Sequence, residues 1–266
     1  MIKKYPLIIL ILSLAVAALA DGNIKDNQLS ISVNTMSMDY TEYALDGSFA
    51  DSENTDSMTG FGLSYATRIG NGFYGESGFF DVDFSLYHGD TRYDGYYLDK
   101  YDNIVGSANN LTTNNTITEG SLGYFETKSI YQALWFTRVG IGYREWERDL
   151  SNGHNEKYSW FYGSLSTGLS GNIFPSDNLG ISAEYHRAFS PEMKSNGFGT
   201  FDLGRTDGYS ISIPWIHTLT PSWALKFAYT YQTWDIEHST IHPDGHHEPR
   251  SESYFNIFNA ALIYRY

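Results

Sequence analysis

The chain has 266 residues, with 31 Asp and Glu against 17 Lys and Arg, so its formal net charge at pH 7 is −14. So acidic a chain does not neutralise phosphates with clustered basic residues, and nucleic acid is therefore excluded as a partner. It has no Cys, so disulfides do not stabilise it. Aromatic residues are abundant, with 22 Tyr, 16 Phe and 6 Trp.

The first 20 residues have the pattern of a secretory signal peptide. Lys3 and Lys4 precede an apolar run from Leu7 to Val16, and Ala18-Leu19-Ala20 provides the small residues that signal peptidase requires. The run is shorter than the roughly 20 residues of a membrane-spanning helix. We expect cleavage after residue 20 and a single domain over residues 21–266. Without the two lysines the net charge becomes −16 (−14 − 2).

Apolar and polar residues alternate with period 2 throughout the rest of the chain, which predicts β-strands. One apolar row is formed by Trp223, Leu225, Phe227, Tyr229 and Tyr231. Short turns rich in Gly, Pro and Asn occur at 70–72, 174–178 and 219–222, for example. They alternate along the chain with long polar stretches at about 41–57, 88–117, 147–157, 190–206 and 236–251. Five long loops imply ten strands, near 28–40, 58–69, 73–87, 118–127, 131–146, 158–171, 179–189, 207–217, 223–236 and 252–266.

The last strand identifies the class of sheet. Phe258, Ala260, Leu262, Tyr264 and Tyr266 form an apolar row that ends on an aromatic residue. This strand resembles the C-terminal signature of Gram-negative outer-membrane β-barrels. The resemblance implies a closed antiparallel barrel of about ten strands in the outer membrane, with short periplasmic turns and long extracellular loops. Outer-membrane lipid and lipopolysaccharide are then its expected partners, and strand ten pairs with strand one near residues 29–33.

The row that faces the lumen is small and charged. Ser, Gly and Ala dominate it, and its charged or titratable members are Arg68, Asp81, Asp83, Arg138, Arg144, Glu184, His186, Lys226 and Arg265. A ten-stranded lumen is little wider than its own side chains. We therefore expect a plugged interior with paired charges, including a carboxylate partner for Arg265. A narrow porin-like channel is the alternative.

Ten exported strands also resemble the omptin family of outer-membrane proteases. Asp81-Val82-Asp83-Phe84 is similar to the Asp-x-Asp-aromatic half of the omptin site. The resemblance implies a water held between these carboxylates and a His that an Asp orients. In omptins this His belongs to an Asp-x-His pair in the fourth long loop. The corresponding loop here contains no His; His186 lies just before it, and Asp244-Gly245-His246 lies in the fifth loop.

Asp81, Asp83 and His186 are therefore the candidate catalytic residues of an omptin-like protease. The other interpretation of the two aspartates is that they are luminal carboxylates paired with Arg138 or Arg144. An Asp-x-Asp pair is common at inward positions of such a strand, because the lumen favours polar side chains.

Two loops offer oxygen and nitrogen ligands for metals. The fifth loop contains His238, His242, His246 and His247, followed by Glu248; of these, His242, His246 and His247 are candidate ligands of a transition metal such as Zn²⁺. The second loop carries Asp90, Asp94, Asp99 and Asp102, which suit Ca²⁺ or the divalent ions that bridge lipopolysaccharide, although their spacing fits no EF-hand. Both sets are also typical of solvated loops. No motif for a cofactor is present, and none is expected.

The leading hypothesis is a non-enzymatic outer-membrane barrel that displays long surface loops for surface structure, adhesion or recognition. An extracellular ligand or a host surface is its expected partner. The omptin-like protease and the narrow channel are the alternatives.

Overall fold

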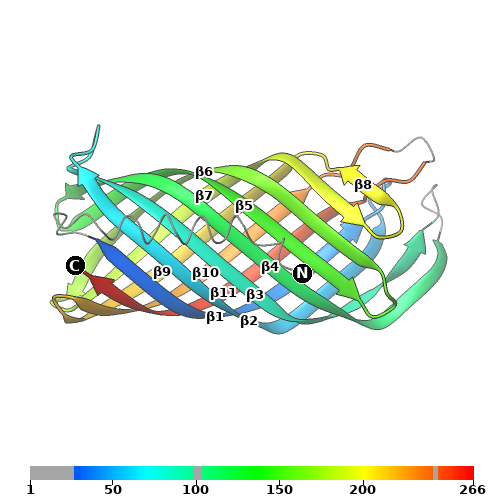
Figure 1. Ribbon diagram of the computed structural model, residues 1–266, viewed down its shortest axis with the longest axis horizontal. Helices are drawn as coiled ribbons and strands as arrows, with labels where there is room; N and C mark the ends of the chain where they lie inside the picture. The colour runs from blue at the N-terminus through cyan, green and yellow to red at the C-terminus, as the bar shows by residue number, and fades with distance from the viewer. Residues whose placement is uncertain (1–26, 99–103, 242–244) are drawn as a thin grey trace, which may run out of the picture.

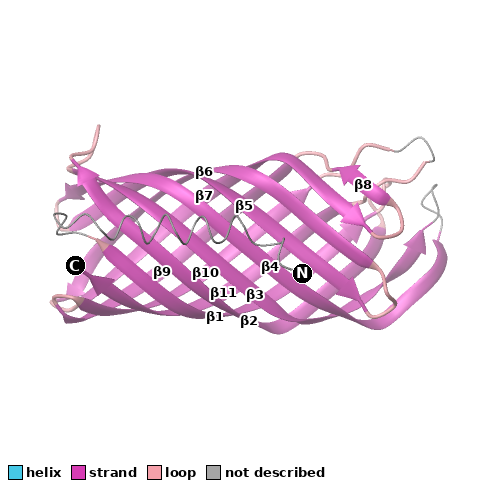
Figure 2. Ribbon diagram, in the orientation of Figure 1, coloured by secondary structure: helices cyan, strands magenta, loops and turns pink. Residues whose placement is uncertain are grey.

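The computed structural model describes residues 27–98, 104–241 and 245–266, so the predicted signal peptide lies outside the described residues. These residues form antiparallel strands and no helix (Figures 1 and 2). The strands are β1 (Gln28–Tyr43), β2 (Phe49–Gly70), β3 (Ser77–Leu98), β4 (Ile104–Ile130), β5 (Ala133–Leu150), β6 (Asn155–Phe174), β7 (Asp177–Ser195), β8 (Gly199–Asp202), β9 (Thr206–Thr220), β10 (Trp223–Ile236) and β11 (Arg250–Arg265). No helix in the described residues is long and apolar enough to cross a membrane.

Ten of these strands close into a ring. From β1 to β7 and from β9 to β11 each strand pairs with the next, β7 pairs with β9, and β1 pairs with β11; the short β8 adds to β7 outside the ring. The closing register sets Leu29 opposite Tyr264 and Val33 opposite Ala260. The predicted closed barrel, and the predicted pairing of the last strand with residues 29–33, are both confirmed.

The two ends of the barrel differ. Short turns and the last residue, Tyr266, lie at one end, which we call the turn end, at the left of Figure 1. Tight connections such as 131–132 and 221–222 join strands there, and Tyr131 adopts a positive φ of 55° in one of them. The opposite end, which we call the loop end, carries β8 and the longer connections.

An apolar band surrounds the outside of the half nearer the turn end. The predicted outward rows are exposed there, as Ile31, Val139, Leu165, Ile211 and Phe258 illustrate. A soluble protein would not expose so many large apolar side chains around its whole circumference. The band therefore fits contact with lipid.

Both faces of β1 and of β5 change from one kind of side chain to the other above this band. On β1 the inward row begins with Ser30, Ser32 and Asn34 and continues with Met36, Met38 and Tyr40, which are fully buried. The outward row changes in the opposite sense, from Ile31 and Val33 to Asp39 and Thr41. The same change occurs on β5, where Val139 and Ile141 give way to Glu145 and Glu147. The barrel wall thus passes from lipid into water while its interior passes from polar to apolar.

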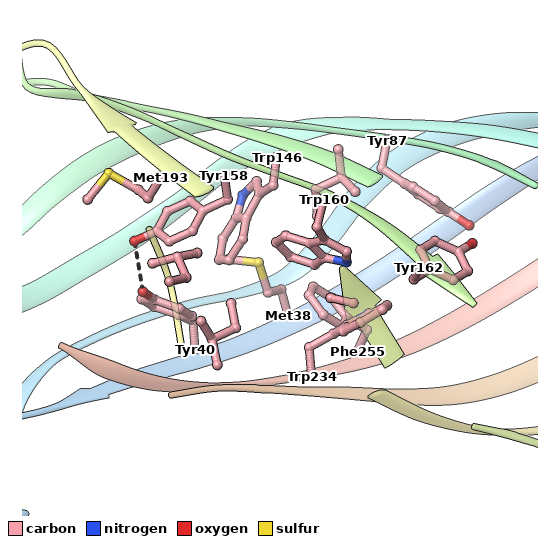
Figure 3. Packing of buried hydrophobic residues seen from close by; sticks show 14 of the residues in the cluster. Met38, Tyr40, Tyr87, Trp146, Tyr158, Trp160, Tyr162, Met193, Trp234 and Phe255 are labelled. Atoms are coloured by element: carbon pink, nitrogen blue, oxygen red, sulfur yellow. Dashed lines mark hydrogen bonds between the residues drawn. The ribbon is translucent and has the colours of Figure 1, made fainter. Parts of the chain in front are cut away.

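The interior of the loop-end half is consequently a hydrophobic core, which Figure 3 shows. Its large, fully buried side chains are Met36, Met38, Tyr40, Met58, Ile117, Trp146, Tyr158, Trp160, Trp234 and Phe255. A plugged interior was predicted, but the prediction that Ser, Gly and Ala line the whole lumen is wrong in this half. Outside the membrane an outward row needs no apolar side chains, so the inward row can carry them.

The predicted long loops are also shorter than expected. Residues 49–57 belong to β2, residues 88–98 to β3, and residues 104–117 to β4, so much of the predicted first and second loops is paired strand. The polar sequence above the band predicts loops, although its backbone continues the hydrogen-bonded pairing of the strands.

We expect the cost of a charge on the outer face to depend on its height. Ile31→Arg places a charge in the apolar band and should lower the free energy of unfolding by about 2–4 kcal/mol. Thr41→Arg, on the same face of β1 above the band, should change it by less than about 1 kcal/mol. Urea unfolding from phospholipid vesicles measures both, and equal losses for the two variants would contradict the position of the band.

Candidate functional site

Asp81 lies in the lumen at the level of the apolar band and binds an arginine. The Nε of Arg138 donates to Asp81 Oδ2 at 2.8 Å and its Nη2 to Asp81 Oδ1 at 2.9 Å. Glu184 approaches the same guanidinium at 3.3 Å and Asp83 at 3.8 Å. Arg138 belongs to β5, two strands along the ring from β3, and its guanidinium lies beside Asp81 and Asp83. Pairing of the luminal carboxylates with Arg138 is confirmed.

His186 lies on β7, two residues beyond Glu184 toward the loop end, and aromatic rings surround it. Its ring centroid is 5.1 Å from that of Tyr162 and 5.3 Å from that of Trp234. Both imidazole nitrogens are buried and lack a hydrogen-bond partner, so His186 is hydrogen-bonded neither to Asp81 nor to Asp83. The structure does not bring the three candidate catalytic residues into the arrangement that the omptin resemblance implies.

A polar cavity of about 200 Å³ lies beside these residues. Asp83, Lys226 and Glu119 contribute its charged side chains, and serines, asparagines and tyrosines from β1, β2, β3, β4, β6 and β11 line the rest of its wall. Arg144 lies above it, with a 2.5 Å ion pair to Glu119 and its guanidinium 5.0 Å from the ring centroid of Phe255. The buried rings of the hydrophobic core separate this cavity from the loop end.

Arg265 differs from the prediction. No salt bridge joins it to a carboxylate among the described residues, so the expected luminal partner is wrong for these parts of the chain. It lies at the turn end, where its backbone N–H donates to the carbonyl of Ser222 at 2.8 Å. Water at an open barrel end solvates such a cation without a partner.

A second charged group lies inside the barrel above the apolar band; we call it the arginine cluster, and it consists of Arg148, Glu42, Asp51, Glu53, Glu156 and Glu248. Arg148 is buried and binds Glu53 at 2.8 Å, Glu156 at 2.7 Å and Glu42 at 3.3 Å. Its guanidinium also lies 4.4 Å from the ring centroid of Tyr40. One cation thus pairs with three carboxylates, which β1, β2 and β6 contribute.

Hydroxyl groups complete the arginine cluster. Tyr40 donates to Glu42 and Tyr158 to Glu248, and Tyr93 donates to Asp51 Oδ2 at 3.0 Å. A buried carboxylate needs such donors, because removing it from water is otherwise costly. The cluster therefore joins β1, β2, β3, β5, β6 and the connection before β11 at the mouth of the barrel.

The carboxylates of the arginine cluster differ in their protonation. Burial, and then the charge of Glu42, raise the pKa of Asp51 well above its usual range. Burial, together with Glu42 and Glu156, raises the pKa of Glu248 in the same way. Burial opposes the ionisation of Glu156, but Arg148 and His154 outweigh it and lower its pKa. As the pH rises, Glu156 therefore ionises before Asp51 and Glu248.

The predicted metal sites are only partly within the described residues. His242 and Asp244 lie outside them, and so do Asp99 and Asp102. His246 packs on Phe198, with ring centroids 5.1 Å apart. Asp90 accepts a hydrogen bond from the amide of Asn114, and Asp94 from Arg92. Within the described ranges, no group of three or more His, Asp or Glu side chains is arranged to hold a metal. Metal binding remains a prediction.

One Ser-His-Glu group also lies near the mouth. His154 Nε2 is 3.0 Å from Glu156 Oε1 and 3.5 Å from Ser195 Oγ. A serine hydrolase needs the two ring nitrogens to divide these roles, one toward the acid and the other toward the serine. Here a single nitrogen serves both contacts, so the arrangement is a structural hydrogen-bond group.

The sequence did not reveal the arginine cluster. The polar sequence around Glu42, Asp51, Glu53 and Arg148 predicts loops, and only the continuing period-2 parity of Trp146, Arg148 and Leu150 with Arg144 indicates an inward position. Arg148 and its partners Glu42 and Glu53 are far apart in sequence, so the pattern of a single segment does not predict that they are in contact.

Removing the cation of the arginine cluster should destabilise the barrel. Arg148→Met leaves Glu53 and its neighbours buried without a positive charge, so the free energy of unfolding should fall by about 3–5 kcal/mol. Lys194→Met, which removes an exposed lysine from Glu192, is the control and should cost less than about 1 kcal/mol. Urea unfolding followed by tryptophan fluorescence checks both values. Equal effects would show that Arg148 is not needed.

The arginine cluster should also make stability depend on pH. Asp51 and Glu248 have raised pKa values in the folded state, so their contribution is complete below the unfolded carboxyl pKa of about 4 and is lost as pH rises through the folded values. Glu156 raises the pKa of His154, which adds a loss of the same sign near neutral pH. The urea concentration at the midpoint of unfolding should therefore decrease as the pH is raised from 5 to 8.

Glu248→Gln provides the matched variant for this pH dependence. It retains an oxygen for the Tyr158 hydroxyl and cannot ionise, so its midpoint should fall less than that of the wild type over the same range. A variant that is as pH-dependent as the wild type would contradict a proton on Glu248.

Comparison with known proteins supports the fold. No protein-family model and no curated protein matches the sequence. Among solved structures, the outer-membrane protease OmpT from Escherichia coli has a TM-score of 0.59 at 11% identity, over 92% of this chain and 98% of that one. An outer-membrane channel from Pseudomonas putida F1 gives 0.45 at 10% identity, over 92% and 99%. The translocator domain of the autotransporter NalP from Neisseria meningitidis gives 0.44 at 11% identity, over 95% and 92%. The chain therefore has the fold of the Gram-negative outer-membrane β-barrels, and its apolar band fits the same membrane.

Proposed function

We propose that this protein is a non-enzymatic barrel of the outer membrane that recognises a cationic partner through its extracellular loop end. The observation that carries the proposal is the distribution of charge along the barrel. In the described parts of residues 37–58, 88–116, 145–158, 190–207 and 233–252, 19 residues are Asp or Glu and 6 are Lys or Arg, an excess of 13 negative charges (19 − 6). The remaining described residues have 7 of each kind.

The acidic side chains of the loop end face water as well as the interior. Glu145, Glu147 and Asp149 follow one another on the outward face of β5, and Asp39, Asp202 and Glu237 are exposed on other elements. A concentration of one sign of charge raises the local concentration of oppositely charged molecules and accelerates their association. The same surface repels polyanions, so a cationic peptide or protein is the partner that it favours.

Rigid presentation supports recognition. The strands continue above the apolar band as paired sheet, and the hydrophobic core and the arginine cluster fill the interior behind them. A binding surface fixed in this way loses little conformational freedom on binding. Outer-membrane lipid and lipopolysaccharide are the proposed surroundings of the band below.

Two observations weigh against the other hypotheses. The aspartate pair of the protease hypothesis contacts Arg138, and His186 contacts aromatic rings. The channel hypothesis needs a continuous aqueous path, whereas Trp146, Trp160 and Trp234 are fully buried across the interior.

Octalysine is a suitable first probe of the proposed function. Purified protein in detergent micelles should bind it at 50 mM salt, and the affinity should fall about tenfold or more at 500 mM salt, since the Debye length shrinks well below 10 Å. Isothermal titration calorimetry measures both affinities, and mass spectrometry should recover the probe intact. Cleaved probe would support the omptin-like hydrolase instead.

A triple variant localises the binding. Asp39→Asn, Asp202→Asn and Glu237→Gln together remove three exposed charges from the loop end and should weaken octalysine binding several-fold. Glu76→Gln, which removes an exposed carboxylate at the turn end, is the control and should leave it unchanged. Absence of octalysine binding by the wild type would refute the proposal.

A further inference from the structure

The hairpin of β3 and β4 extends beyond the other strands at the loop end. Ile104 pairs with Leu98 and Leu111 with Tyr93, whereas β5 ends at Leu150, opposite Thr113 of β4. The last backbone contact on that side runs from the N–H of Ser151 to the carbonyl of Thr112 at 2.8 Å. Figure 1 shows β4 continuing past the end of β5. In the parts of the chain that the structure describes, no strand pairs with the second edge of Ile104–Leu111, which we call the β4 edge.

The sequence of the β4 edge lacks the charged residues and prolines that usually protect a free edge from pairing with another strand. An unpaired edge presents a row of N–H and C=O groups to any other strand, and natural proteins normally place Lys, Pro or other charges there. Residues 104–111 contain no charged residue and no Pro, and Ile104 and Val105 are 61% and 66% exposed. The ladder with β3 has two register irregularities here, one at Val105 and one between Ala108 and Leu111, where Asn110 has a positive φ of 57°.

The β4 edge is also held in place. The N–H of Asn110 donates to Asp94 Oδ1 at 2.8 Å, which fixes the backbone at the irregularity between Ala108 and Leu111. Tyr93, Ala108 and Leu150 form a small buried cluster at the base of the hairpin, with Leu111 packed against it. Tyr93 is in turn hydrogen-bonded to Asp51 of the arginine cluster. The edge is therefore an ordered template, which lowers the entropic cost of adding a strand.

We propose that the β4 edge binds an extended, cationic peptide segment by β-strand addition. This inference rests on the proposed function, because the acidic loop end selects the charge of the partner and the edge supplies its backbone hydrogen bonds. A second copy of this chain is a poor occupant, since its own loop end carries the same excess of negative charge. A free segment with alternating Lys and apolar residues satisfies both requirements.

Three octapeptides test the strand addition. The first alternates Lys and Val, the second is identical but N-methylated at every Val, and the third alternates Glu and Val. N-methylation keeps charge and side chains but removes the N–H donors from one edge of the peptide. Calorimetry with the full chain in micelles should give at least tenfold tighter binding for the first than for the second, and no binding of the third.

The site of addition is tested with variants of the hairpin. Gly106 and Ser107 pair regularly with Tyr97 and Tyr96, so their N–H groups point to opposite sides and one of Gly106→Pro and Ser107→Pro removes a donor from the β4 edge. At least one of these two variants should lose the tenfold preference, while Val105→Thr should keep it. Heat-modifiable migration on gels verifies that the barrel of each variant is folded.

The outcomes separate the two proposals. Equal binding of the first and second peptides would overturn strand addition and leave recognition of a cationic partner intact. Retention of the preference by both proline variants would overturn the β4 edge as its location. Failure of the first two peptides to bind more tightly than the Glu-Val peptide would overturn both proposals.

Discussion

Closure of the ring is the constraint on which the rest of the structure depends. Hydrocarbon offers no hydrogen-bond partner, so every strand in the apolar band must be paired on both sides. The pairing of β1 with β11 along their whole lengths meets this requirement. Closure with only ten strands also makes the lumen narrow, and the protein's own side chains then fill it. The position of each luminal group follows from this one backbone arrangement.

The change from lipid to water outside the barrel determines what lies inside it. Where lipid covers the wall, outward side chains are apolar, and Asp81, Arg138 and Glu184 share a polar interior. Above the band, outward side chains are acidic, and the interior becomes a hydrophobic core with Arg144 and Arg148 among its aromatic rings. A single closed sheet thus combines a membrane barrel with a barrel whose packing is that of a soluble protein.

The sequence predicts the first of these two parts well. Period-2 rows and the aromatic last residue were enough for the ring, the lipid-facing residues and the pairing of the last strand with residues 29–33. The part above the band was predicted less well, because polar outward residues such as Asp39 and Glu147 resemble a loop when they are read alone. Inward Met36, Met38 and Tyr40 continue the parity of Ser32 and Asn34, and this continuity is the signal that the strand goes on. The arginine cluster has no such local signal, since Glu42, Glu53, Arg148 and Glu248 meet only in three dimensions.

The continuation of the strands above the band has a mechanical consequence. On β1 nine residues lie beyond Asn34 (43 − 34), and with a rise of about 3.3 Å and a tilt near 40° they lift the loop end roughly 23 Å above the hydrocarbon. Continuous paired strands form this height, without a flexible tether, so the loop end stands at a fixed elevation and orientation. Under the proposed function, a partner has to approach from one direction, and the length of a β-strand sets its distance from the hydrocarbon.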